Sequence, residues 1–183
     1  MFHLSVRPLA QCVQDKDLFA EIYCSFLAKR LLNRLSFNQD SEVSIISMYK
    51  LQCGAQFSSK MEGMINDLRS AAVEHREFTD NWKTMGRSLE FTPQVLRAGY
   101  WPAFVSVGER IALPPIMEDA VTNFQIYYAH KADSKRRLTW QYTQGDATMT
   151  ARFPTRTHTL LVTTLQAIVL SLFNSDQECF RIE

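Results

Sequence analysis

The sequence predicts an α+β protein in which a helical bundle, residues 1–95, is followed by a small α/β domain, residues 96–183. Apolar residues recur at steps of three and four before residue 90, which is typical of amphipathic helices. Between residues 138 and 153 they recur at steps of two, which indicates strands. Prolines and glycines gather over residues 93–115, where a long regular helix could not pass.

The first helix is expected over residues 15–34, with Asp15 as its N-cap. Its apolar face is expected to contain Phe19, Ile22, Tyr23, Phe26, Leu27 and Leu31. On this phase Phe26 lies in the core, and a Phe26→Asp change is expected to unfold the bundle because it buries an unpaired charge.

Three more helices complete the predicted bundle. The second begins at Asp40 or Ser41 and ends at Gly54, which is placed as a glycine that follows a helix C-terminus. The third begins at Ser58 or Ser59, and the fourth covers residues 73–85.

The second half is expected to start with a helix over residues 117–130. A β-hairpin follows, with Leu138, Trp140 and Tyr142 on one strand, a turn at residues 145–146, and a second strand containing Ala147, Met149 and Ala151. Residues 160–162 are a candidate third strand. Thr163 or Thr164 is then expected to cap a last helix that reaches about residue 173.

The charge balance and the cysteine spacing argue against several classes of protein. Residues 1–95 carry 11 basic and 11 acidic side chains, and residues 96–183 carry 9 and 8, so nucleic acid is not expected as the main partner. The four cysteines have no CxxC spacing and the histidines are scattered, so neither disulfides nor a metal site is expected. No apolar stretch has the length of a membrane span. We expect an intracellular protein without cofactors or membrane contact.

Catalytic motifs are absent. The chain has no GxSxG, HExxH, P-loop or GxGxxG sequence. Cys53, beside Gly54, is the nearest approach to a nucleophile, and a packed cysteine at a helix end is the better interpretation. We therefore expect no enzyme activity.

Short motifs in a fixed order carry a family resemblance. The first set contains Asp17-Leu18-Phe19, Tyr23, residues 27–32, Asp40, Glu42, Lys50, Cys53-Gly54, Phe57, Lys60, Gly63-Met64 and Asp67. The second contains Gly99-Tyr100-Trp101-Pro102, Leu113-Pro114, Phe124, Tyr127-Tyr128, Arg137-Leu138-Thr139-Trp140, residues 166–170 and Phe173-Asn174. In this order and spacing they resemble the C-terminal part of the cullins, the scaffold subunits of multisubunit ubiquitin ligases.

The resemblance implies a docking scaffold without an active site. In cullins this region is a four-helix bundle followed by an α/β domain, whose sheet takes in a strand of a RING-box protein that recruits a ubiquitin-conjugating enzyme. The implied RING-protein contacts are Leu138, Trp140, Tyr142, Ala147, Met149 and Ala151. Lys29 and Arg30 are the candidates for contacting the acidic tail of the conjugating enzyme. Cullin regulators are further candidate partners, and the cytoplasm and nucleus are the expected locations.

The sequence departs from the family pattern in three ways, one of which is Lys135-Arg136-Arg137-Leu138 in place of glycine, two basic residues and leucine. The sequence lacks the family's N-terminal helical repeats, and it ends before the winged-helix part that carries the lysine for a ubiquitin-like modifier. We therefore expect no attachment of that modifier to this chain. The alternative function is a cullin-like interaction module without ligase activity.

Overall fold

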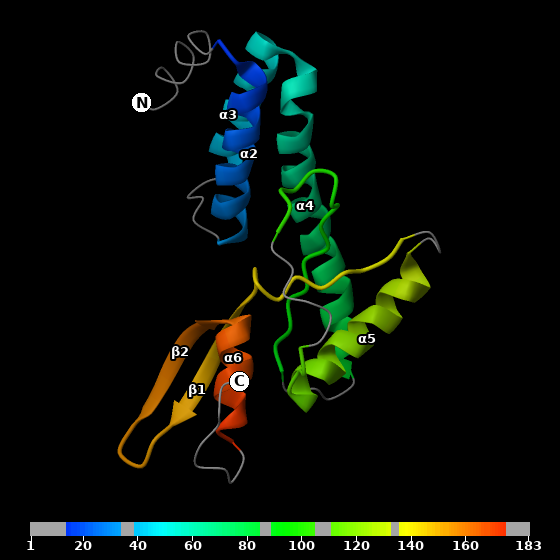
Figure 1. Cartoon of the computed structure of the whole chain (residues 1–183). Helices are drawn as coiled ribbons and strands as arrows, with labels where there is room; N and C mark the ends of the chain where they lie inside the picture. The colour runs from blue at the N-terminus through cyan, green and yellow to red at the C-terminus, as the bar shows by residue number, and fades with distance from the viewer. Residues whose placement is uncertain (1–13, 34–38, 85–88, 105–110, 133–135, 175–183) are drawn as a thin grey trace. The chain divides into compact units, whose positions relative to one another are not determined.

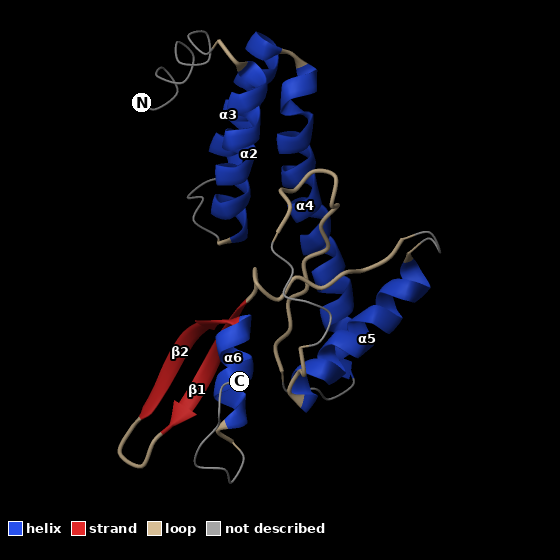
Figure 2. Ribbon diagram, in the orientation of Figure 1, coloured by secondary structure: helices blue, strands red, loops and turns tan. Residues whose placement is uncertain are grey.

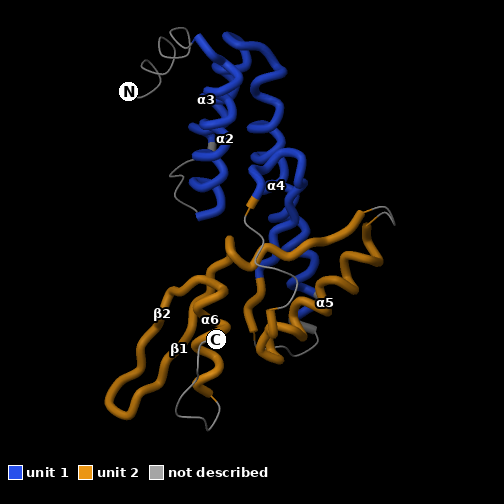
Figure 3. The backbone as a smooth tube through the Cα atoms, viewed as in Figure 1, with its two compact units in different colours: residues 1–87, 92–103 blue, residues 88–91, 104–183 orange. Residues whose placement is uncertain are grey.

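The structure is a computed structural model that describes residues 14–33, 39–84, 89–104, 111–132 and 136–174. It contains two compact units (Figure 3). The first unit consists of Met1–Arg87 and Thr92–Ala103. The second unit consists of Ser88–Phe91 and Phe104–Glu183. No single cut of the chain separates them, because residues 92–103 belong to the helical unit. The proposed division after residue 95 remains a prediction. The order of the elements, helices first and then a small α/β part, confirms the α+β class (Figure 2).

The described part of the first unit contains the helices α2 (Lys16–Leu32), α3 (Gln39–Cys53) and α4 (Ala55–Thr84) (Figure 1). Asp15 caps α2 as predicted, because its carboxylate accepts the Leu18 N–H at 3.0 Å. Gly54 ends α3 with a φ of 101°, a left-handed conformation that glycine adopts without a steric penalty. Both α2 and α3 pack against α4.

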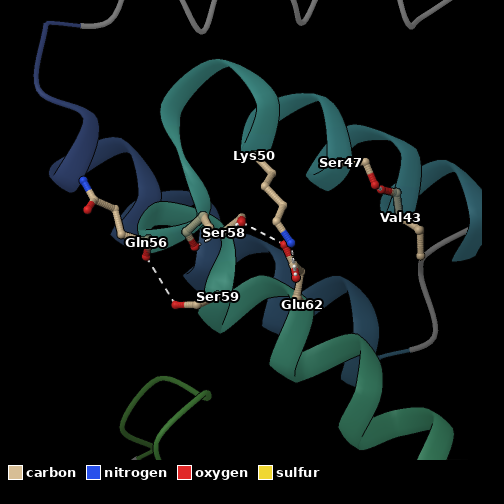
Figure 4. A network of polar contacts seen from close by, with 8 residues as sticks. Val43, Ser47, Lys50, Gln56, Ser58, Ser59 and Glu62 are labelled. Atoms are coloured by element: carbon tan, nitrogen blue, oxygen red, sulfur yellow. Dashed lines mark hydrogen bonds and ion pairs between the residues drawn. The ribbon is translucent and has the colours of Figure 1, made fainter.

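The predicted third and fourth helices are one continuous helix, α4. It begins at Ala55, and Ser58 and Ser59 lie inside its first turns instead of capping it. The Ser58 hydroxyl donates to Glu62 at 2.8 Å, and the Lys50 ammonium of α3 reaches the same carboxylate at 3.0 Å (Figure 4). Burial would raise the pKa of Glu62, but these two hydrogen bonds outweigh it and lower the pKa. The Lys50–Glu62 pair therefore joins α3 to α4, and Ser58 holds the same carboxylate from within α4.

The predicted phase of α2 is wrong at Phe26. Its buried residues are Cys24, Leu27, Ala28 and Leu31, whereas Phe26 is 57% exposed. Leu18 and Ile22 are also exposed and lie on the same helical stripe as Phe26. An aspartate at position 26 would be hydrated, so the expectation that Phe26→Asp unfolds the bundle is withdrawn.

The second unit contains α5 (Pro115–Lys131), β1 (Asp146–Arg152), β2 (Thr157–Thr163) and α6 (Thr164–Leu172). The two strands form an antiparallel sheet in which Met149 lies opposite Leu160, and α6 packs against both strands. Thr163 caps α6 as predicted, and its side chain and that of Gln166 bond reciprocally to each other's backbone N–H.

The predicted hairpin pairing is wrong. Residues 138–142 are not a strand, and β1 pairs with β2 instead. The Phe153 N–H donates to the Arg156 carbonyl at 2.9 Å and closes the connection between β1 and β2. Gly145 precedes β1, and its carbonyl accepts the Thr164 N–H at 2.9 Å. The residues predicted as a turn therefore lie where β1 begins, beside the start of α6.

Candidate docking surfaces

Residues 136–142 approach β1 without joining the sheet (Figure 1). Within the described parts of the chain, residues 136–140 neither donate nor accept a backbone–backbone hydrogen bond. Backbone amides and carbonyls need partners when they leave water. This segment can therefore accept a strand without giving up a bond to a described residue.

Trp140 holds this segment to the second unit. Its ring centroid lies 5.9 Å from that of buried Phe124, 6.1 Å from Phe91 and 6.4 Å from Tyr142. The alternating apolar residues 138–142 thus include aromatic rings that pack together. The same alternation is typical of a strand, which explains the predicted hairpin. Trp140 Nε1 and Gln141 Oε1 are buried and have no hydrogen-bond partner among the described residues. One donor and one acceptor next to the unpaired backbone are therefore unsatisfied among the described residues.

Ala147, Met149 and Ala151 lie on one face of β1 and are half-buried. Across the ladder they face Val162, Leu160 and His158. They form a small apolar layer, which is where the side chains of an added strand could insert.

The sheet also exposes edges and apolar side chains. It has two strands in the described part of the chain, so neither β1 nor β2 has a ladder partner there on its outer edge. Large apolar side chains of this unit are exposed at Leu161 (75%), Phe153, Phe173, Val169 and Leu172. Unpaired edges with nearby exposed apolar groups are typical of interaction surfaces.

Lys29 and Arg30 do not form one free basic pair. The Arg30 guanidinium binds buried Glu42 through Nε at 2.9 Å and Nη2 at 3.1 Å, and the Tyr23 hydroxyl donates to the same carboxylate at 3.3 Å. Burial, with Glu42 next in size, raises the pKa of Tyr23 to about 12. Lys29 is exposed, with its ammonium 5.9 Å from the centre of the Phe26 ring. Arg30 therefore joins α2 to α3, and Lys29 carries the accessible charge.

A second buried carboxylate explains part of the family motif. Asp67 of α4 accepts the Trp101 Nε1–H at 3.0 Å and the Arg97 N–H at 2.8 Å, and it pairs with Arg97 Nε at 3.2 Å. A Cβ on buried Gly63 would overlap the Tyr100 ring. These residues belong to separate motifs of the sequence, and their spacing does not predict the contact between them. The signal was the polar residue Asp67 on an otherwise apolar face of α4.

No group of three potential ligands that could hold a metal ion occurs among the described residues. Cys24 and Cys53 are free thiols, and burial raises the pKa of Cys24, although Lys60 opposes this effect. None of the described helices has the length and apolar character needed to cross a membrane.

Two domain families match the chain. The cullin α solenoid domain matches residues 6–74, and the cullin α+β domain matches residues 95–183. Cullin-1 of Oryza sativa subsp. japonica is 41% identical over 172 residues, which are 92% of this chain and 23% of the relative. Cullin-2 of Arabidopsis thaliana is 40% identical over 90% of this chain and 22% of the relative. Cullin-4A of Mus musculus is 35% identical over 91% of this chain and 22% of the relative.

The chain thus spans less than a quarter of the length of these curated relatives. The matches cover both structural units, and they include Gly63, Asp67 and the Tyr100–Trp101 pair that meet in the helical unit. The chain belongs to the cullin family.

Proposed function

We propose that this chain acts as a scaffold in a cullin-RING ubiquitin ligase, where it docks a RING-box protein and thereby a ubiquitin-conjugating enzyme. Family membership supports the scaffold role. We expect the chain to work without catalytic groups of its own, in the cytoplasm and nucleus. The alternative function, an interaction module without ligase activity, would apply if no RING-box protein bound.

One observation carries the docking proposal: the backbone of residues 136–140 is unpaired beside a packed tryptophan. A strand from the partner would satisfy these amides and carbonyls by β-augmentation. The aromatic cluster around Trp140 fixes the segment on one side, so less conformational entropy is lost when the other side is covered. Unpaired backbone and anchored side chains are the two features that this binding mode requires.

Side chains would supply specificity. Leu138, Trp140 and Tyr142 would contact the added strand directly, and Trp140 Nε1 and Gln141 Oε1 would gain hydrogen-bond partners. Ala147, Met149 and Ala151 would contribute the apolar layer of β1. These six contact residues remain predictions.

Recruitment of the conjugating enzyme's acidic tail would depend on Lys29. Because Arg30 neutralises buried Glu42, reversing Arg30 would destabilise the helical unit and obscure any effect on binding. Lys29→Glu is therefore the informative variant. We expect it to slow association at low salt and to leave thermal stability unchanged, since charges at an interface rim act mainly on association rate.

A proline tests the docking mode directly. Thr139 is exposed, and its N–H has no backbone partner among the described residues, so Thr139→Pro removes a donor without breaking such a bond. The control, Thr139→Val, keeps the N–H and a β-branched side chain. We expect the chain to co-purify with a RING-box protein, Thr139→Val to bind equally, and Thr139→Pro to bind about tenfold more weakly. Equal binding by both variants would show that this backbone is not the docking edge.

A further inference from the structure

We propose that a pocket in the helical unit binds a short acidic segment of a protein partner, with an apolar side chain inside the pocket and a neighbouring carboxylate on Arg76. This inference does not rest on the proposed function, which assigns nothing to this part of the chain. It comes from a cavity of about 320 Å³ that combines an apolar floor with one arginine. That volume lies at the lower end of the range for ligand pockets.

The pocket lies between one face of α4 and residues 92–94. The residues that α4 contributes recur at steps of three and four, so they lie on the same side of the helix. They are Leu68, Ala71, Ala72, His75 and Arg76, and the other wall contains Thr92, Pro93 and Gln94. All of them belong to the first unit, so the pocket does not depend on where the second unit lies.

Hydrogen bonds within the helical unit hold the two walls together. Asp67, on the α4 turn before the pocket, accepts the Arg97 N–H at 2.8 Å and the Trp101 Nε1–H at 3.0 Å. These bonds fasten the chain just beyond residues 92–94 to α4, and Pro93 is buried. The pocket is therefore formed before a ligand binds, so less conformational entropy is lost on binding.

Arg76 gives the pocket its preference for a carboxylate. The side chain is exposed and makes no ion pair with another described residue. Asp80 lies one turn further along α4, yet no ion pair joins it to Arg76. No acidic side chain occurs among the described residues that line the pocket. A guanidinium group binds a carboxylate through two parallel N–H donors, so charge complementarity favours an acidic ligand.

The other lining groups favour a peptide over a free acid. Leu68, Ala71 and Pro93 provide apolar surface for one side chain. Thr92 and Gln94 are exposed, and their hydroxyl and amide groups both donate and accept hydrogen bonds, as the backbone of a peptide requires. An apolar residue next to a glutamate or an aspartate would use all three kinds of group at once.

A pair of four-residue peptides tests the charge requirement on the whole chain. Both are acetylated and amidated, one with the sequence Gly-Glu-Leu-Gly and its control with glutamine in place of glutamate. In NMR titrations we expect the acidic peptide to shift the backbone amide signals of Ala71, Ala72 and Gln94, with a dissociation constant on the order of 1 mM. The control should bind about tenfold more weakly, because it lacks the charge-assisted hydrogen bonds.

Two variants remove the charge and the space separately. Arg76→Gln removes the guanidinium, and Ala72→Leu fills part of the cavity without changing its charge. Both positions are exposed, so we expect both variants to fold, which circular dichroism checks. Arg69→Gln is the matched control, because Arg69 is exposed on the same helix and does not line the pocket. We expect the first two variants to bind the acidic peptide about tenfold more weakly and Arg69→Gln to bind like the parent.

Three outcomes would overturn the proposal. The first is an acidic peptide that leaves the pocket amides unshifted at about ten times the expected dissociation constant, or that binds no better than its glutamine control. The second is an equal loss of binding in Arg69→Gln and Arg76→Gln, which would indicate general attraction to a basic helix. The third is isovalerate, a free acid with a similar apolar group, binding as tightly as the peptide, which would assign the pocket to small carboxylates.

Discussion

The two units differ in how they satisfy their backbone and charged groups. In the helical unit, buried Glu42 and Asp67 each have a cationic partner, and Leu27, Met61 and Met64 are almost completely buried. In the α/β unit, the sheet has two strands with unpaired outer edges in the described part of the chain, and Leu161 is 75% exposed. The first unit pairs its buried carboxylates within itself, whereas the second leaves both sheet edges without a ladder partner among the described residues.

The largest loss of unfolding free energy should come from a substitution in the core of the helical unit. Leu27 is fully buried and its neighbour Phe26 is 57% exposed, so the two residues form a matched pair on α2. We expect Leu27→Ala to lower the free energy of unfolding by about 3–4 kcal/mol and Phe26→Ala by less than about 1 kcal/mol. Chemical denaturation measures both values, and a larger loss for Phe26→Ala would reverse the helix phase.

The second largest loss of stability should come from breaking the contact between α4 and residues 97–101. Asp67→Ala would leave the Trp101 indole N–H and the Arg97 amide without their acceptor. We expect a loss of about 3 kcal/mol in unfolding free energy. Asp80→Ala is the control, because Asp80 lies on the same helix and is exposed. Similar midpoints for the two variants would mean that Asp67 is not a structural anchor.

Alkaline pH should weaken the helical unit through Tyr23. Its pKa in the folded chain is raised from 10.0 to about 12, chiefly by burial. The contribution of this group to stability is complete below pH 10 and is lost as the pH rises from 10 to 12, because the unfolded chain releases its proton first. Partial exposure limits the loss to about 1–2 kcal/mol.

The difference between the parent and Tyr23→Phe isolates this effect, since the other ionisable groups are present in both proteins. We expect the stability of the parent to decline more steeply than that of Tyr23→Phe between pH 10 and pH 12 in urea denaturation. Parallel curves would show that Tyr23 ionises equally in the folded and unfolded chains.

The smallest effect should be found on the exposed sheet. Leu161 lies opposite Thr148 on the outer face of the hairpin. Leu161→Thr keeps a residue that favours strands, so we expect the unfolding free energy to change by less than about 0.5 kcal/mol. A loss comparable with that of Leu27→Ala would mean that Leu161 is covered in solution.

The sequence predicted local helix signals well. Asp15, Gly54 and Thr163 mark helix ends as expected, because caps depend on residues close in the chain. It predicted α4 as two helices because Ser58 and Ser59 also match an N-cap signal. In the structure Ser58 donates to Glu62 and Ser59 to the Gln56 carbonyl, both inside α4. The error at Phe26 has a similar cause. Apolar residues lie on more than one face of α2, and tertiary packing determines which face is buried.

Strand pairing was predicted less well. The alternating residues 138–142 and 147–151 have the same pattern, yet only the second segment is a strand. Pairing depends on residues distant in the chain, and the aromatic cluster of Phe91, Phe124 and Trp140 could not be read from spacing. Of the proposed site residues, the pattern located the β1 set on one face but did not indicate that Arg30 is bound to Glu42.

Amide hydrogen exchange on the whole chain, with and without a RING-box protein, tests most directly whether a partner completes the second unit. In the free chain we expect slow exchange in the middle of α4 and fast exchange at residues 136–140, whose amides have no backbone partner among the described residues. Adding the RING-box protein should slow exchange at residues 136–140 and leave α4 unchanged. Protection of these amides in the free chain, or no change on adding the partner, would contradict the proposed docking edge.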